Sequence, residues 1–123
     1  MIIITEGSDE LIQLDIKDNA LTAINIDDLE NIKLTVTDNN VKEEFILTGA
    51  TGSQKDINII SATQGQVNFV IDRNFTTRNP GISFDLIIEL IFDQDGVNTY
   101  YLDNKKHSIY EYEKYIKIER VNL

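Results

Sequence analysis

The longest apolar-rich run of the chain, residues 81–92, constrains the fold most strongly. It follows the turn signal Asn79-Pro80-Gly81. Within it, one face of a strand would carry Phe84, Leu86, Ile88, Leu90 and Phe92, and the other face would carry Asp85 and Glu89. This period of two is typical of a strand with one face in a core. An acidic, Gly-containing turn at 93–96 and a returning strand at 97–102 follow, so the stretch 79–102 predicts a β-hairpin at the centre of a sheet. The expected core residues are Phe84, Leu86, Ile88 and Leu90.

The same alternation recurs along the rest of the chain. It predicts strands within 2–5, 10–16, 32–37, 41–47, 57–60, 67–71 and 109–121. Within residues 20–30, the pattern allows a strand edge at 21–26 and a short turn or a single helical turn at 27–30, and residues 72–79 are expected to be a polar connection. Short strands with a turn signal every 8–12 residues, and no convincing helix, are typical of a sandwich or small barrel. The sequence therefore predicts an all-β, immunoglobulin-like antiparallel β-sandwich.

Size and composition agree with this fold class. At 123 residues the chain suits a single domain over residues 1–123 with one core. Its 20 Ile against four Ala favour strands over helices. With no Cys, disulfides and thiolate metal sites are excluded. No apolar run is long enough to span a bilayer, and the first five residues lack the basic flank of a signal peptide.

Motifs for metal or phosphate chemistry are incomplete. Residues 93–96 begin like a calcium loop, but the sixth and twelfth positions of that loop hold Asn98 and Asn104 instead of Gly and Glu. His107 is the single histidine, so no histidine-based zinc site can be assembled. The loop 49–55 lacks the Gly-Lys-Ser/Thr ending of a phosphate loop. The sequence predicts neither a bound metal nor a cofactor.

Catalytic constellations are also missing from the sequence. His107 and Ser108 are neighbours on a predicted strand, so their side chains should point to opposite faces. A glycosidase needs two carboxyl groups held across a cleft, whereas adjacent acids on turns and strand edges are normally solvated. The adjacent acids here are Asp9/Glu10, Asp27/Asp28 and Glu43/Glu44. We therefore expect a protein that is not an enzyme.

Charge and tyrosines point to the C-terminal region instead. The net charge of −10 disfavours contact with nucleic acid, and residues 101–123 are close to neutral while the rest is acidic. Tyrosine is enriched at protein interfaces and can stack on sugars, but it also packs between strands. The alternatives are cross-strand packing between 97–102 and 109–118, a protein interface, or a sugar site. All five tyrosines lie in the last 24 residues: Tyr100, Tyr101, Tyr110, Tyr112 and Tyr115.

The order of these patterns resembles the immunoglobulin-like modules of tailed-phage virions, especially the N-terminal domain of baseplate upper proteins and auxiliary capsid-decorating proteins. Three stretches carry the resemblance: Glu6-Gly7-Ser8-Asp9 before a strand, the strands 21–26 and 32–36, and Pro80-Gly81 entering a long strand that turns at Asp95-Gly96. The resemblance implies a virion protein, made in the host bacterial cytoplasm, that binds capsid, tail or fibre proteins and possibly itself. It implies no catalytic residues, no nucleic acid and no membrane. The chain ends at Leu123 without a coiled coil, which favours a decoration protein or fibre adaptor over a baseplate fibre.

Overall fold

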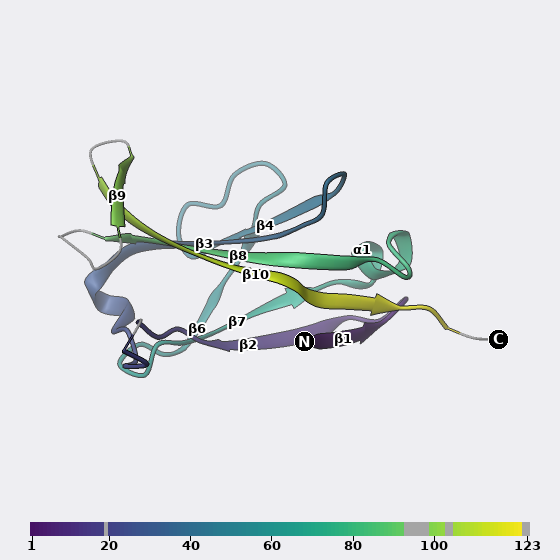
Figure 1. Ribbon diagram of the computed structural model, residues 1–123, viewed down its shortest axis with the longest axis horizontal. Helices are drawn as coiled ribbons and strands as arrows, with labels where there is room; N and C mark the ends of the chain where they lie inside the picture. The colour runs from purple at the N-terminus through teal and green to yellow at the C-terminus, as the bar shows by residue number, and fades with distance from the viewer. Residues whose placement is uncertain (19, 93–98, 103–104, 122–123) are drawn as a thin grey trace.

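The protein folds into two packed β-sheets, as the computed structural model in Figure 1 shows. The structure describes residues 1–18, 20–92, 99–102 and 105–121. A seven-stranded sheet has the order β1 (Ile2–Thr5), β10 (Lys105–Glu119), β8 (Ser83–Phe92), β3 (Leu29–Thr37), β4 (Lys42–Ile46) and β5 (Lys55–Asp56), and β9 (Thr99–Leu102) also pairs with β10. A three-stranded sheet has the order β2 (Glu10–Asp15), β7 (Gln66–Ile71) and β6 (Asn58–Ser61). The prediction of an all-β sandwich is confirmed.

The period-two alternation places one face of each long strand in the core. Along β8, Phe84, Leu86 and Leu90 are fully buried and Ile88 is 6% exposed, while Ile87 is only partly buried. This confirms the predicted core face. Aromatic rings join the layers: Phe45 of β4 lies against Phe69 of β7, with ring centroids 4.7 Å apart. Buried side chains from both sheets form one hydrophobic cluster.

The pairing of β8 differs from the predicted hairpin. β8 pairs antiparallel with β3 on one side and with β10 on the other, so no edge is left for β9. β9 instead pairs with residues 105–108 at the start of β10. The predicted hairpin between 84–92 and 97–102 is therefore wrong, although β8 does lie inside the sheet. The predicted turn at 93–96 is outside the described residues.

Two strand pairs depart from the antiparallel pattern that the sequence predicted. β1 pairs parallel with residues 116–119 of β10, and β4 pairs parallel with the short β5. The other pairs are antiparallel. β10 is long: Figure 1 shows it crossing the molecule from β9 toward β1.

The connection 72–79 contains a helix that the sequence analysis did not predict. Helix α1 (Arg73–Arg78) begins at Asp72, whose carboxylate accepts a hydrogen bond from the Phe75 N–H at 3.0 Å. Phe75 is buried against Phe84 of β8, with centroids 5.0 Å apart. This anchors the helix at one end of the sandwich. In the stretch 20–30, the chain forms a 3-10 turn, η1 (Ile26–Asp28), near the expected helical turn, whereas the expected strand edge at 21–26 is reduced to an isolated bridge between Ala23 and Lys17.

Candidate interaction site at the open edge of β10

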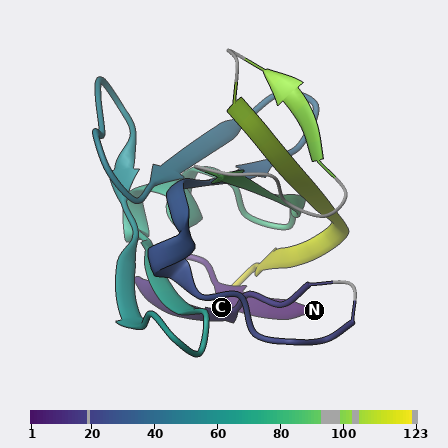
Figure 2. The same cartoon turned by 90° about the vertical axis from the view of Figure 1, so that its left-hand side faces the viewer.

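Strand β10 has an edge that is occupied at both ends and open between them. β8 covers one side of β10 from residue 106 to residue 117. On the opposite side, β9 pairs with residues 105–108 and β1 pairs with residues 116–119. Among the described residues, no strand pairs with the seven positions in between. We call residues 109–115 the open edge (Figure 2 shows the same strands from the end of the molecule).

A β-bulge interrupts the open edge. Tyr112 is opposite Leu86 and Ile116 is opposite Phe84, so three residues of β10 face one residue of β8. Lys114 within this bulge has a φ of 48°, a conformation that few side chains other than Gly adopt. Its backbone N–H donates to the Asp85 carboxylate at 2.8 Å, which holds the bulge against β8. The bulge changes the register between β10 and β8, so the side chains after Tyr112 lie opposite different residues of β8 than they would on a regular strand.

The bulge brings two predicted interface residues together. The rings of Tyr112 and Tyr115 lie 5.4 Å apart at 58°, the tilted arrangement that aromatic pairs favour. Because opposite residues of an antiparallel pair share a face, Tyr110 and Tyr112 are on the same face as Ile88 and Leu86, the face that meets the second sheet. Tyr110 and Tyr115 pack partly against the core, whereas Tyr112 is 44% exposed.

A groove runs between the two sheets at this position. It has a volume of about 290 Å³, and Tyr112 and Tyr115 line it from the seven-stranded sheet. Leu86 and Ile88 form its apolar floor, and the edge strand β2 supplies Gln13, Leu14 and Asp15 on the other side. The tyrosines therefore cover the seam between the sheets and leave one ring accessible. Tyr115 is partly packed against the core, whereas the ring of Tyr112 next to it is accessible to a partner.

The side chain of Tyr110 is partly shielded from water. Burial raises the pKa of its hydroxyl, and a hydrogen bond to Ser108 acts in the opposite direction. Asp18, just beyond β2, is close enough to add a repulsive charge. Tyr110 therefore stays neutral at physiological pH and can act as a hydrogen-bond donor.

The remaining predicted interface residues are Tyr100 and Tyr101. Both belong to β9, where they are opposite His107 and Lys106 of β10. Their side chains lie outside the described residues. The tyrosine region is thus divided between β9 and the open edge, and the predicted packing of 97–102 on 109–118 is replaced by pairing of 99–102 with 105–108.

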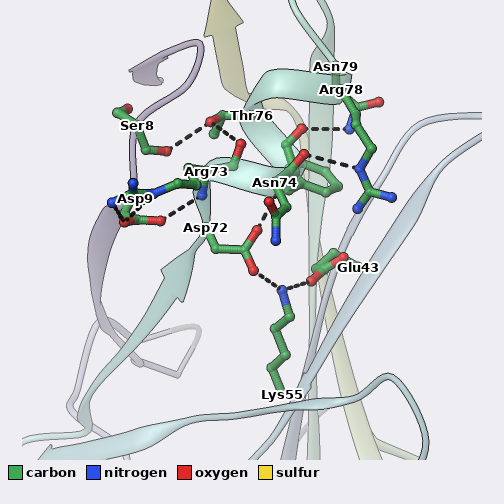
Figure 3. A network of polar contacts seen from close by, with 11 residues as sticks. Ser8, Asp9, Glu43, Lys55, Asp72, Arg73, Asn74, Thr76, Arg78 and Asn79 are labelled. Carbon is green, nitrogen blue, oxygen red and sulfur yellow. Dashed lines mark hydrogen bonds and ion pairs between the residues drawn. The ribbon is translucent and has the colours of Figure 1, made fainter.

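A second polar cluster lies at the α1 end of the sandwich and is drawn in Figure 3. Lys55 of β5 bridges two carboxylates, making an ion pair with Glu43 of β4 and one of 2.6 Å with Asp72. Arg73 bonds the Asp9 carboxylate through its guanidinium at 2.9 Å and through its backbone N–H at 2.6 Å. These contacts tie α1 to both sheets, so the cluster has a structural role.

The ion pairs also lower the pKa values of several acidic side chains. The hydrogen bond from Lys55 is the main reason that the pKa of Asp72 is below its ordinary value. Arg73 lowers the pKa of Asp9 in the same way, and Lys33 lowers that of Glu44. Desolvation alone would lower the pKa of Lys55, but its hydrogen bonds to Asp72 and Glu43 outweigh it and raise the pKa. A general acid needs the opposite shift, a raised carboxyl pKa.

Sequence reasoning grouped the tyrosines but missed how they meet. The groove walls come from β2 and β8, which are separated in sequence from β10, and no residue of the bulge is a Gly or Pro that would have marked it.

Within the described ranges, no group of three or more His, Asp or Glu side chains is placed to hold a metal ion. The same residues include no helix with the length and apolarity to cross a membrane.

The site therefore consists of an unpaired strand edge among the described residues, a tyrosine pair, and a groove with an apolar floor and an acidic margin. No known family model matches the chain, and no curated protein sequence is significantly similar to it.

Proposed function

We propose that this chain is a non-enzymatic structural protein of a tailed-phage virion, which acts by docking onto other virion proteins. In this role it is an auxiliary or decoration protein on the capsid, or an adaptor for fibres or the tail. The proposal rests on one observation above all: Tyr112 and Tyr115 line a groove beside the open edge, with Tyr112 exposed. Tyrosine at a partly dry groove is typical of protein interfaces.

Two further features favour a role in binding other proteins over a role in catalysis. The pKa shifts of Asp9, Glu44 and Asp72 are downward and arise from ion pairs with Arg73, Lys33 and Lys55, and none of these residues lines the groove. The net charge of −10 disfavours nucleic acid and anionic membrane surfaces as partners. The resemblance of the strand order to phage modules supplies the location, the virion, with synthesis in the bacterial cytoplasm.

The test is incorporation into particles. The triple substitution Tyr110→Ala, Tyr112→Ala and Tyr115→Ala should abolish co-purification of the protein with phage particles, while thermal unfolding checks that the variant is folded. Leu11→Ala with Val70→Ala removes comparable exposed apolar surface from the outer face of the three-stranded sheet and should leave incorporation intact. Absence of the wild-type protein from purified particles, or of capsid, portal and tail genes beside its own, would contradict the proposal.

A carbohydrate-binding sandwich is the second candidate. The exposed ring of Tyr112 next to Tyr115 favours it, since sugars stack on such rings. Saturable binding on a glycan array that is lost in Tyr112→Ala, with particle assembly unchanged, would decide for this alternative.

A further inference from the structure

The open edge differs from an ordinary sheet edge because it is closed at both ends. β9 stops at the partner of Ser108 and β1 starts at the partner of Ile116. Alternate residues of a strand direct their N–H and C=O groups to opposite sides, so part of the backbone of residues 109–113 points away from β8. Because of the bulge, the seven open positions run beside five residues of β8, Asp85 to Glu89, and at roughly 3.3 Å per residue they span about 17 Å. The edge can therefore accept a short strand.

We propose that this edge binds a short, extended, basic segment of a partner protein as an added β-strand. The segment pairs with residues 109–112, up to the bulge, and places alternate side chains over the groove beside Tyr112. The inference rests on the proposed function and specifies how the partner is recognised. Main-chain hydrogen bonds supply affinity in this mode, and pockets for alternate side chains supply specificity.

The geometry argues against a second copy of the chain as the occupant. A neighbouring β10 running antiparallel along the open edge would extend beyond it at both ends. There it would meet β1 and β9, which occupy the same row of the sheet. Two copies would also bring together chains that each carry a net charge of −10. Only a segment of about five or six residues fits between the flanking strands.

The negative charge around the open edge favours a basic segment as the partner. Glu111 and Glu113 on the open edge and Asp15 on the wall of the groove are all exposed. Lys114 is the one cation among residues 109–115. Like charges opposite one another on paired strands are unfavourable, and opposite charges are favourable. Lys or Arg side chains on the added strand would lie near Glu111, while apolar side chains on its other face cover the groove.

The experiment uses the full chain and a library of N-acetylated hexapeptides in which Lys or Arg alternates with Val, Ile or Tyr. We expect saturable binding by library members, measured by fluorescence polarisation, with amide hydrogen exchange slowed among residues 109–113. Versions of the binding peptides that are N-methylated at alternate residues lose one row of backbone donors and should not bind. Acidic versions, with Glu in place of Lys and Arg, should not bind either.

A matched pair of variants tests the charge argument. Glu111→Lys should weaken binding on the order of five-fold, because an attraction becomes a repulsion. Asp56→Lys makes the same change of charge on β5, at the other edge of the same sheet, and should leave binding unchanged.

Several outcomes would overturn the proposal. These are no saturation by any library member up to about 1 mM, equal binding of the N-methylated peptides, or exchange protection away from the open edge. Protection of the open edge that rises with protein concentration without peptide would identify a second copy as the occupant. If the library fails while the tyrosine variant still loses particle incorporation, strand addition is wrong and the proposed docking function stands.

Discussion

Two neighbouring isoleucines of β8 provide a matched test of the core. Ile88 faces the hydrophobic cluster with 6% of its surface exposed, and Ile87 is on the opposite face of the same strand. Both are replaced by Ala, so the chemical change and the strand are the same. Only the environment of the side chain differs.

The magnitude follows from what surrounds each side chain. Ile→Ala removes three carbon atoms, worth about 2.4 kcal/mol of lost transfer free energy for a buried site at ~0.8 kcal/mol per carbon. At Ile88 a cavity term adds to this, because Leu34 and Tyr110 on the flanking strands are fixed by pairing. We expect a loss of about 3–4 kcal/mol in the free energy of unfolding for Ile88→Ala. For the partly exposed Ile87 we expect about 1 kcal/mol.

Urea denaturation followed by circular dichroism measures both values. The midpoint should fall in each variant without a change in the slope m, and more for Ile88→Ala. A difference of about 2 kcal/mol corresponds to roughly 8 °C in Tm for a chain of this size. An equal or larger loss for Ile87→Ala would show that the buried face of β8 has been assigned wrongly.

Two further predictions concern a turn and the ion-pair cluster. Gly65→Ala should cost roughly 2–4 kcal/mol of stability, because φ is +67° and a Cβ would lie 2.5 Å from the Ile16 carbonyl oxygen; Gly52→Ala, with φ of +61° and open space around it, should cost about 1 kcal/mol in the same urea assay. The pKa of Asp72 is lowered on folding, so its charge stabilises the fold above its ordinary pKa of 3.8 and this contribution is lost as the pH falls through the lowered value. Asp72→Asn should therefore flatten the acid side of the pH–stability profile, and an unchanged profile would contradict the role assigned to the Lys55 ion pair.

The strands predicted best from the sequence are those that an alternation of apolar and polar neighbours identifies. The alternation of Ile12, Leu14 and Ile16 or of Ile32, Leu34 and Val36 identifies a strand and its buried face, because both depend only on neighbours in sequence. Pairing partners depend on distant segments, and here the prediction was wrong: the hairpin signal at 93–96 favoured β8 with β9, but β3 and β10 occupy both edges of β8.

Helix α1 was missed because six residues give no helical period to recognise. Its start is fixed by Asp72 as a cap and by burial of Phe75, and only the first is visible in sequence. The candidate site shows the same limit. Composition located the tyrosines, but the contact between Tyr112 and Tyr115 depends on a bulge at Lys114 that no turn residue marks.

The parallel pairing of β1 with the end of β10 determines how the protein responds to tension. Ile2 is paired with Ile116 and Thr5 with Glu119, so the two strands run side by side in the same direction (Figure 1). A force that pulls the chain before Ile2 away from the chain after Glu119 slides one strand along the other. It therefore loads the hydrogen bonds between them together instead of opening them one at a time.

Such a pair acts as a mechanical clamp. Rupture requires the bonds of this pair to break in a single step, and the rate of that step governs forced unfolding. Pulling in single-molecule experiments on these two ends should give high rupture forces. Attachment instead at Lys33 and Ile46, which are opposite each other on the antiparallel strands β3 and β4, would unzip that pair from one end and require less force.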